Sequence, residues 1–162
     1  ESSIMEIGMC FDWYGIIIVD SVIKTSHGIM TPAEMVDTLK EESGYKDEYL
    51  EGYKKDITPK EKEYADFVFS QEEKISAYVN ELIAWAEKGD IEMIKASIPK
   101  MYEMTDPTID AINNIMDTKM YYNEEQSEIL NKKIDNFSNF ICTLLALCFV
   151  MSVCASFSKK CN

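Results

Sequence analysis

The sequence predicts an all-α protein: an antiparallel up-and-down four-helix bundle whose last helix continues beyond the bundle. Three observations lead to this fold class. The 162 residues include only 6 Gly and 4 Pro, too few for the frequent turns of a β-sandwich or barrel. Hydrophobic residues, 46% of the chain, recur in steps of three and four, which is the spacing of bundle helices. Helix-capping signals separate these runs at three points.

The capping signals set the expected helix boundaries. Residues 31–34 (TPAE) and 58–61 (TPKE) each offer a threonine cap, a proline at the first helical position and a glutamate that completes a capping box. Gly89 can end a helix in the left-handed conformation, and Asp90 can cap the next helix. The expected helices are therefore 1–28, 32–56, 59–88 and 91–135, with the last one continuing through 136–158.

Two features of these helices leave alternatives open. Pro99 and Pro107 near the start of the last helix are compatible with a kink or with a separate short helix around residues 91–101. Residues 16–19 (IIIV) make the first helix apolar on every side, which is more than one bundle core absorbs. Either a second buried face in a homodimer or a locally overfilled core would account for this run.

An uncharged segment near the C-terminus predicts a transmembrane helix. Residues 136–158 form a run of 23 residues without a formal charge, with an apolar centre at residues 140–157. A helix of that length covers roughly 30 Å. A buried core helix is the alternative. Because Lys159 and Lys160 follow the run, the positive-inside tendency predicts a protein of the inner (cytoplasmic) membrane. Residues 1–135 would then be periplasmic or extracellular and 159–162 cytoplasmic, and we expect an earlier transmembrane helix before Glu1.

The composition argues against several other classes of protein. A net charge of -13 at pH 7 repels nucleic-acid phosphates, so no nucleic-acid partner is expected. The single histidine, His27, lacks a glutamate three positions earlier, and no glycine-rich phosphate loop occurs. We therefore expect no enzyme activity, cofactor or metal site. Cys10 is the one cysteine of the polar part, and we interpret it as a small buried residue or, alternatively, as a bridge across a dimer.

Three segments of the sequence, 14–35 (YGIIIVDSVIKTSHGIMTPAEM), 49–68 (YLEGYKKDITPKEKEYADFV) and 87–116 (EKGDIEMIKASIPKMYEMTDPTIDAINNIM), carry a resemblance to a known family. They resemble the four-helix-bundle ligand-binding domain of methyl-accepting chemotaxis proteins. The resemblance implies a homodimer that binds a small molecule at the membrane-distal end, between the first and fourth helices, and transmits a small shift of the last helix across the membrane. Amino-acid-sensing members hold the ligand carboxylate with arginines, and this chain has none.

Polar residues facing the expected cleft are the candidate ligand-binding residues. On the first helix, the residues spaced to face the bundle become polar after Ile18. A binding site would explain this change, and loss of burial near a helix end explains it equally well. Lys24 can also form an ordinary i,i+4 ion pair with Asp20. Tyr14 is an aromatic residue on the core-facing side of its helix, and such residues more often pack in the core than bind a ligand. The candidates from both sides of the cleft are Tyr14, Ser21, Lys24, Thr25, His27, Lys95, Lys100, Tyr102 and Asn113.

The expected function is that of a periplasmic ligand-sensing domain of a bacterial chemoreceptor. Its ligand would be an amino acid, an organic acid or an amine, bound directly or through a periplasmic binding protein. The same kind of domain also precedes histidine kinases and diguanylate cyclases, so the output is left open. A non-sensing, membrane-anchored helical adaptor is the alternative from a different class, because no sharp pocket signature is present.

Overall fold

The computed structural model describes the backbone of residues 2–158 and the side-chain surroundings of residues 3–148. Over this range the chain forms helices and turns with no strand, which confirms the all-α prediction. The chain divides into two compact units, Glu1–Met120 and Tyr121–Asn162. The first unit contains the candidate site and is described below.

The first helical run contains a change of helix type that the sequence did not indicate. It consists of α1 (Ser2–Phe11), a π-helix η1 (Asp12–Ile17) and α2 (Ile18–Ser26). π-helical turns inside α-helices are rare and occur frequently at functional sites. Within η1, Gly15 allows close packing, because a Cβ atom there would lie 3.3 Å from the Ile109 side chain.

The first capping box forms as predicted. Gly28 adopts a positive φ of 72° after α2, and α3 (Pro32–Tyr53) begins directly after Thr31. The Glu34 backbone N–H donates to Thr31 Oγ1 at 3.2 Å, and the Thr31 backbone N–H donates to Glu34 Oε2 at 2.8 Å. These bonds satisfy amide donors that the first helical turn leaves free.

The second capping signal begins its helix later than predicted. A 3₁₀ turn, η2 (Lys54–Asp56), follows α3, and α4 (Lys62–Glu87) starts three residues after the expected position. The Thr58 backbone N–H still donates to Glu61 Oε1 at 2.5 Å. The same carboxylate is fully buried and lies 3.1 Å from Lys119 Nζ, so a long-range ion pair joins this segment to α6.

The segment around Pro99 resolves into two helices. Gly89 has a φ of 68°, and the Asp90 side chain accepts a hydrogen bond from the Met93 backbone N–H at 3.2 Å, as the capping signal predicted. The short helix α5 (Ile91–Ala96) is followed by α6 (Ile98–Ser158), which contains Pro107. Of the two alternatives for this region, the structure therefore has the separate short helix.

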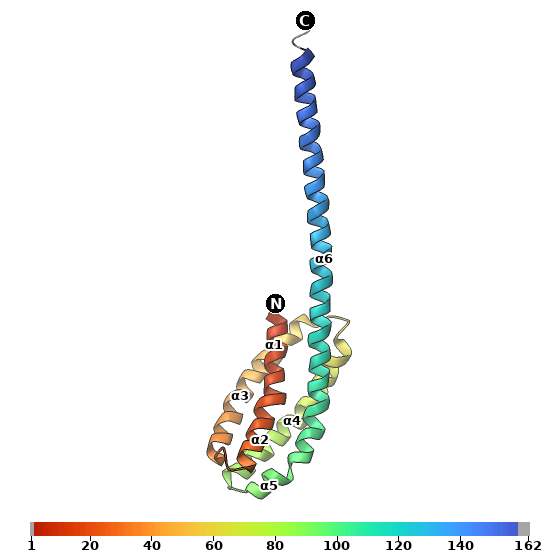
Figure 1. Cartoon of the computed structure of the whole chain (residues 1–162). Helices are drawn as coiled ribbons and strands as arrows, with labels where there is room; N and C mark the ends of the chain where they lie inside the picture. Colours follow the sequence, from red (N-terminus) through yellow and green to blue (C-terminus); the bar gives the residue numbers. More distant parts are fainter. Residues whose placement is uncertain (1, 159–162) are drawn as a thin grey trace. The chain divides into compact units, whose positions relative to one another are not determined.

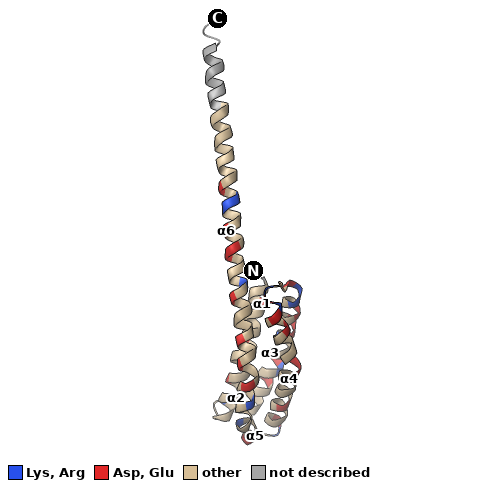
Figure 2. Cartoon of the chain, turned by 90° about the vertical axis from the view of Figure 1, so that its right-hand side faces the viewer, with Lys and Arg blue, Asp and Glu red and all other residues tan. Residues whose placement is uncertain are grey.

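The helices of Glu1–Met120 enclose one hydrophobic core. α3 packs against α1 and α4, and α5 packs against α2 and α4. The two views in Figures 1 and 2 show the first helical run, α3, α4 and the beginning of α6 lying alongside one another. The largest fully buried side chains are Tyr14, Tyr53, Tyr78, Ile7, Ile18, Met35, Leu39, Ile75, Leu82, Ile94, Met101 and Ile112.

The predicted membrane location is wrong. Among the residues that the structure describes, no helix combines the length and the hydropathy needed to cross a membrane. This finding contradicts an inner-membrane protein with residues 1–135 outside and the C-terminus in the cytoplasm. The side chains of 149–158 and the expected cytoplasmic segment 159–162 lie outside the described residues.

Candidate ligand-binding site

A pocket of about 490 Å³ lies at the turn that joins α2 to α3. Its wall includes Thr25 and His27 from the end of α2 and Lys95 from α5, three of the residues that the sequence nominated. The helices bring them together because α2 packs against α5. The remaining lining residues are Ser26, Gly28, Met30, Thr31, Pro32 and Ile91.

Thr25 carries an unsatisfied polar atom in this wall. Its side chain is only 1% exposed, and Thr25 Oγ1 is buried without a hydrogen-bond partner. A buried hydroxyl without a partner costs free energy, of the order of 1–3 kcal/mol, which a ligand can recover by hydrogen bonding. The carbonyl groups of the last turn of α2 accept bonds from the turn itself, as in the 3.1 Å bond from the Gly28 N–H to Thr25 O.

His27 is exposed, and its hydrogen bonding fixes the position of one proton. His27 Nδ1 lies 2.8 Å from the backbone oxygen of Ile23. Because a carbonyl oxygen only accepts hydrogen bonds, Nδ1 must carry the proton. In the neutral imidazole, Nε2 is then the acceptor, and in the imidazolium it becomes a second donor.

Lys95 supplies a cation to the same pocket. Its Nζ lies 3.1 Å from Glu92 Oε1 on the same helix, and both side chains are substantially exposed. Such exposed i,i+3 pairs contribute little to stability and exchange readily for other partners. Lys95 is therefore available to a carboxylate or another acceptor that enters the pocket.

Tyr14 lies elsewhere, in a buried polar network that joins η1, α3 and α4. Its hydroxyl donates to Glu72 Oε2, and Lys46 Nζ donates to Glu72 Oε1. Ser76 Oγ adds a bond of 2.9 Å to Glu72 Oε1, and Asp47 Oδ1 lies 2.6 Å from Lys46 Nζ. Since Tyr14 precedes Thr25 by eleven helical residues, the two lie about 16 Å apart along the helix.

Tyr14 and Lys46 are buried in this network, whereas Glu72 is partly exposed. Burial, followed by the negative charge of Glu72, raises the pKa of the Tyr14 hydroxyl well above its ordinary range. The same two causes raise the pKa of the Cys10 thiol to about 12. Cys10 is a free, buried thiol, as expected from its interpretation as a small core residue.

The other nominated residues do not line the pocket. Ser21 is buried in α2, and Lys24 Nζ lies 2.6 Å from Asp20, the ion pair expected from their spacing. Lys100 Nζ lies 2.6 Å from Glu81 and 5.3 Å from the centre of the Tyr78 ring. Lys100, Tyr102 and Asn113, all on α6, are exposed.

Sequence reasoning missed the contribution of the turn itself. Thr31 and Pro32 were recognised as a helix start, yet they also line the pocket. Ser26 was not nominated, and its hydroxyl donates to Ile23 O at 2.8 Å beside the His27 ring. The glycine at position 28 was the available sequence signal for this turn. Its positive φ folds the turn back against the end of α2.

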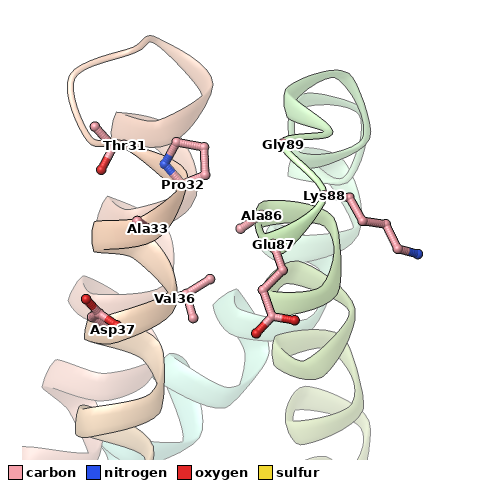
Figure 3. Close-up of a pocket in the computed structure, with 9 residues that line it drawn as sticks. All are labelled: Thr31, Pro32, Ala33, Val36, Asp37, Ala86, Glu87, Lys88 and Gly89. Atoms are coloured by element: carbon pink, nitrogen blue, oxygen red, sulfur yellow. The ribbon is translucent and has the colours of Figure 1, made fainter.

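A second pocket, of about 600 Å³, adjoins the same helix start (Figure 3). Val36 and Glu87 extend into the space between α3 and α4, whereas Lys88 points away from it. Glu87 Oε1 already receives a hydrogen bond of 2.9 Å from Lys40 Nζ. Since the Glu87 carboxylate is already paired, this pocket is a weaker candidate for ligand binding than the pocket at the α2–α3 turn.

Metal binding has no support in the described part of the chain, where no group of three or more His, Cys, Asp or Glu side chains is placed to hold an ion. Comparison with known proteins gives no relationship: no family model, no curated protein and no solved structure matches the chain. The argument about function therefore depends on the residues of the pocket.

Proposed function

We propose that residues 1–120 are a solute-sensing four-helix bundle of the kind that methyl-accepting chemotaxis proteins use. The solute binds in the pocket between the end of α2 and α5. One observation carries the proposal: Thr25 and His27, together with Lys95 from a distant part of the sequence, line a single pocket in which a buried hydroxyl lacks a partner.

The polar groups of the pocket favour a small solute with an acidic or acceptor group. Lys95 can donate to a carboxylate, and the unpartnered Thr25 Oγ1 can donate or accept. His27 Nε2 accepts from a hydroxyl or ammonium group when neutral and donates when protonated. An organic acid or an amino acid satisfies these groups without the bidentate arginine contact that the chain lacks.

The position of Lys95 suggests how binding is transmitted. Lys95 is on α5, which is joined to α6 through Ser97. Ser97 Oγ lies 2.8 Å from the Tyr78 hydroxyl, so the α5–α6 junction is held against α4. A solute that draws Lys95 away from Glu92 would act on α5 and hence on the start of α6. A shift of about 1–2 Å is the expected scale of such a response.

The proposal includes a homodimer formed through the first helical run. Met5, Met9 and Ile16 lie on this run with 69%, 37% and 50% of their surface exposed. Ile18 in the same apolar run is fully buried, so the run has both a core face and an outer face. We expect Ile16→Glu to convert a dimer into a monomer in sedimentation velocity, with unchanged helix content by circular dichroism. A wild-type chain that sediments as a monomer at all concentrations would contradict the dimer.

A thermal-shift screen of the whole chain tests the sensing function. Amino acids, organic acids, amines and aromatic acids are tested singly, and a binding solute raises the melting temperature because it binds the folded state alone. Lys95→Gln should abolish the shift, whereas Lys88→Gln, which removes a lysine directed away from the neighbouring pocket, should preserve it. Absence of a shift with every solute would instead favour a helical adaptor.

A further inference from the structure

A third pocket, of about 230 Å³, lies between the first helical run and α3. Its wall combines three aromatic side chains, Trp13, Tyr45 and Tyr49, with two carboxylates, Asp12 and Glu42. The π-helix η1 supplies Asp12 and the largely buried Trp13, so the irregular helical turn forms part of this site. Sequence analysis did not predict it, because only the packing of α1 and η1 against α3 brings these residues together.

The charges around the pocket favour a cation. Asp12 and Glu42 are half-buried, and no lysine pairs with either of them within the described residues. Lys46 also lines the pocket, but its ammonium group already contacts the carboxylates of both Asp47 and Glu72. The immediate surroundings therefore carry an excess of negative charge, which an anionic ligand would have to overcome.

The combination of aromatic rings and uncompensated carboxylates has a specific chemical meaning. The faces of tryptophan and tyrosine rings attract cations, and aromatic walls of this kind recognise quaternary ammonium and methylated amine groups. A methylated ammonium spreads its charge over an apolar surface, so it loses less hydration on entering such a pocket than a primary ammonium does. The volume is below the range of drug-sized sites, which limits the ligand to a small molecule or head group.

We infer that the pocket formed by Trp13, Tyr45, Tyr49, Asp12 and Glu42 binds a small quaternary ammonium or methylated amine. This site does not depend on the solute pocket at the α2–α3 turn, since the two share no lining residue. A cation bound here would contact α1, η1 and α3 together, and so would stabilise the π-helical turn.

Tryptophan fluorescence of the whole chain provides the first test. The chain has 2 Trp, so a Trp85→Phe variant excited selectively at the tryptophan band reports on Trp13 alone. Tetramethylammonium chloride should change this emission saturably at concentrations up to about 10 mM, whereas sodium chloride and the neutral compound 3,3-dimethyl-1-butanol should not. Calorimetric titration of the wild-type chain gives the same information if Trp85→Phe impairs folding. Absence of saturable binding in both measurements would overturn the inference, as would equal binding of the neutral compound.

Two neighbouring glutamates provide the matched variants. Glu42 lines the pocket, whereas Glu41 is exposed and does not. Glu42→Gln should weaken tetramethylammonium binding about fivefold, because it removes one of the two uncompensated charges. Glu41→Gln should leave the affinity unchanged. Equal effects of the two variants would show that only the overall acidity of the chain attracts the cation, and would overturn the assignment of the pocket.

Discussion

Two buried lysines in the interior of residues 1–120 and one buried threonine at the turn between α2 and α3 differ in their hydrogen-bond partners. In the interior, Lys46 and Lys119 are 3% and 6% exposed, and each ammonium group has a carboxylate partner. At the turn, Thr25 is equally buried, but its hydroxyl has no partner. Tyr53 Oη and Glu61 Oε2 in the interior are also buried without a partner, so Thr25 is distinguished from them by its place in the wall of the α2–α3 pocket.

This comparison also separates the roles of two nominated residues. Tyr14 and Thr25 lie on the same face of one helical run, and both are buried. The Tyr14 hydroxyl is bonded to Glu72, so a ligand would have to break an existing network to reach it. Burial of a polar residue on a helix seam is therefore insufficient evidence for a binding role, and its hydrogen-bond partner decides the interpretation.

The largest expected effect comes from breaking the ion pair at Lys119. Lys119→Met removes the ammonium that lies 3.1 Å from the fully buried Glu61 carboxylate and leaves that carboxylate without a cation. We expect a loss of about 3 kcal/mol in the free energy of unfolding, measured by urea denaturation. Lys62→Met, which removes an exposed lysine paired with Asp66, should cost less than about 0.5 kcal/mol. Similar losses in both variants would contradict a structural role for the buried pair.

A smaller loss is expected from the network around Tyr14. Glu72→Ala removes the acceptor shared by Tyr14, Lys46 and Ser76, while Asp47 remains to pair with Lys46. Because Glu72 is partly exposed and one partner survives, the unfolding free energy should fall by about 2 kcal/mol. The exposed neighbour Glu73→Ala is the control. The network would have no structural role if the two variants unfolded at the same urea concentration.

The buried Cys10 thiol should also make stability depend on alkaline pH. The pKa of Cys10 is raised from its ordinary value of 9.0 to about 12, chiefly by burial. The unfolded chain therefore releases this proton first, so the contribution of Cys10 is fully present below pH 9.0 and is lost as pH rises towards 12. Between about pH 8 and pH 10, the wild-type chain should lose about 1 kcal/mol more stability than Cys10→Ala. Parallel pH profiles for the two proteins would contradict the burial of the thiol.

The smallest expected change in the free energy of unfolding is a gain in stability. Thr25→Val replaces the unpartnered hydroxyl with a methyl group of similar size, so we expect a gain of about 0.5–1 kcal/mol in unfolding free energy together with weaker solute binding. Thr105→Val is the matched control, because Thr105 is also buried but donates to Met101 O at 3.0 Å. It should be neutral or destabilising. If Thr25→Val destabilises the fold as Thr105→Val does, the hydroxyl has a structural role.

Local signals in the sequence predicted the fold better than the positions of its buried charges. The capping box at Thr31 and the cap at Asp90 depend on neighbouring residues alone, and both are present. The π-helical turn at Asp12–Ile17 was not foreseen, since hydrophobic spacing does not distinguish it from an α-helix. The burial of Lys46 in α3 could not be foreseen either, because its partner Glu72 lies 26 residues away.

The candidate site was predicted only in part for a similar reason. Thr25 and His27 come from the polar end of a seam, and Lys95 follows a recognised helix cap, so their types and positions could be read locally. Their convergence depends on α5 being a separate helix packed on α2. Lys100 was nominated from the same stretch, but it pairs with Glu81 on α4. The membrane span predicted from the uncharged, apolar run in 136–158 is contradicted, because no helix among the described residues is long and apolar enough to cross a membrane.

The most direct test of solute binding at the α2–α3 turn uses the single histidine of the chain. The imidazole proton signals in NMR then come from His27 alone and report on one wall of the pocket. We predict that the solute giving the largest thermal shift moves these signals saturably in the wild-type chain, and that the movement is lost in Lys95→Gln. Tetramethylammonium should leave them in place. His27 signals that do not respond to a solute that stabilises the protein would contradict the proposed site.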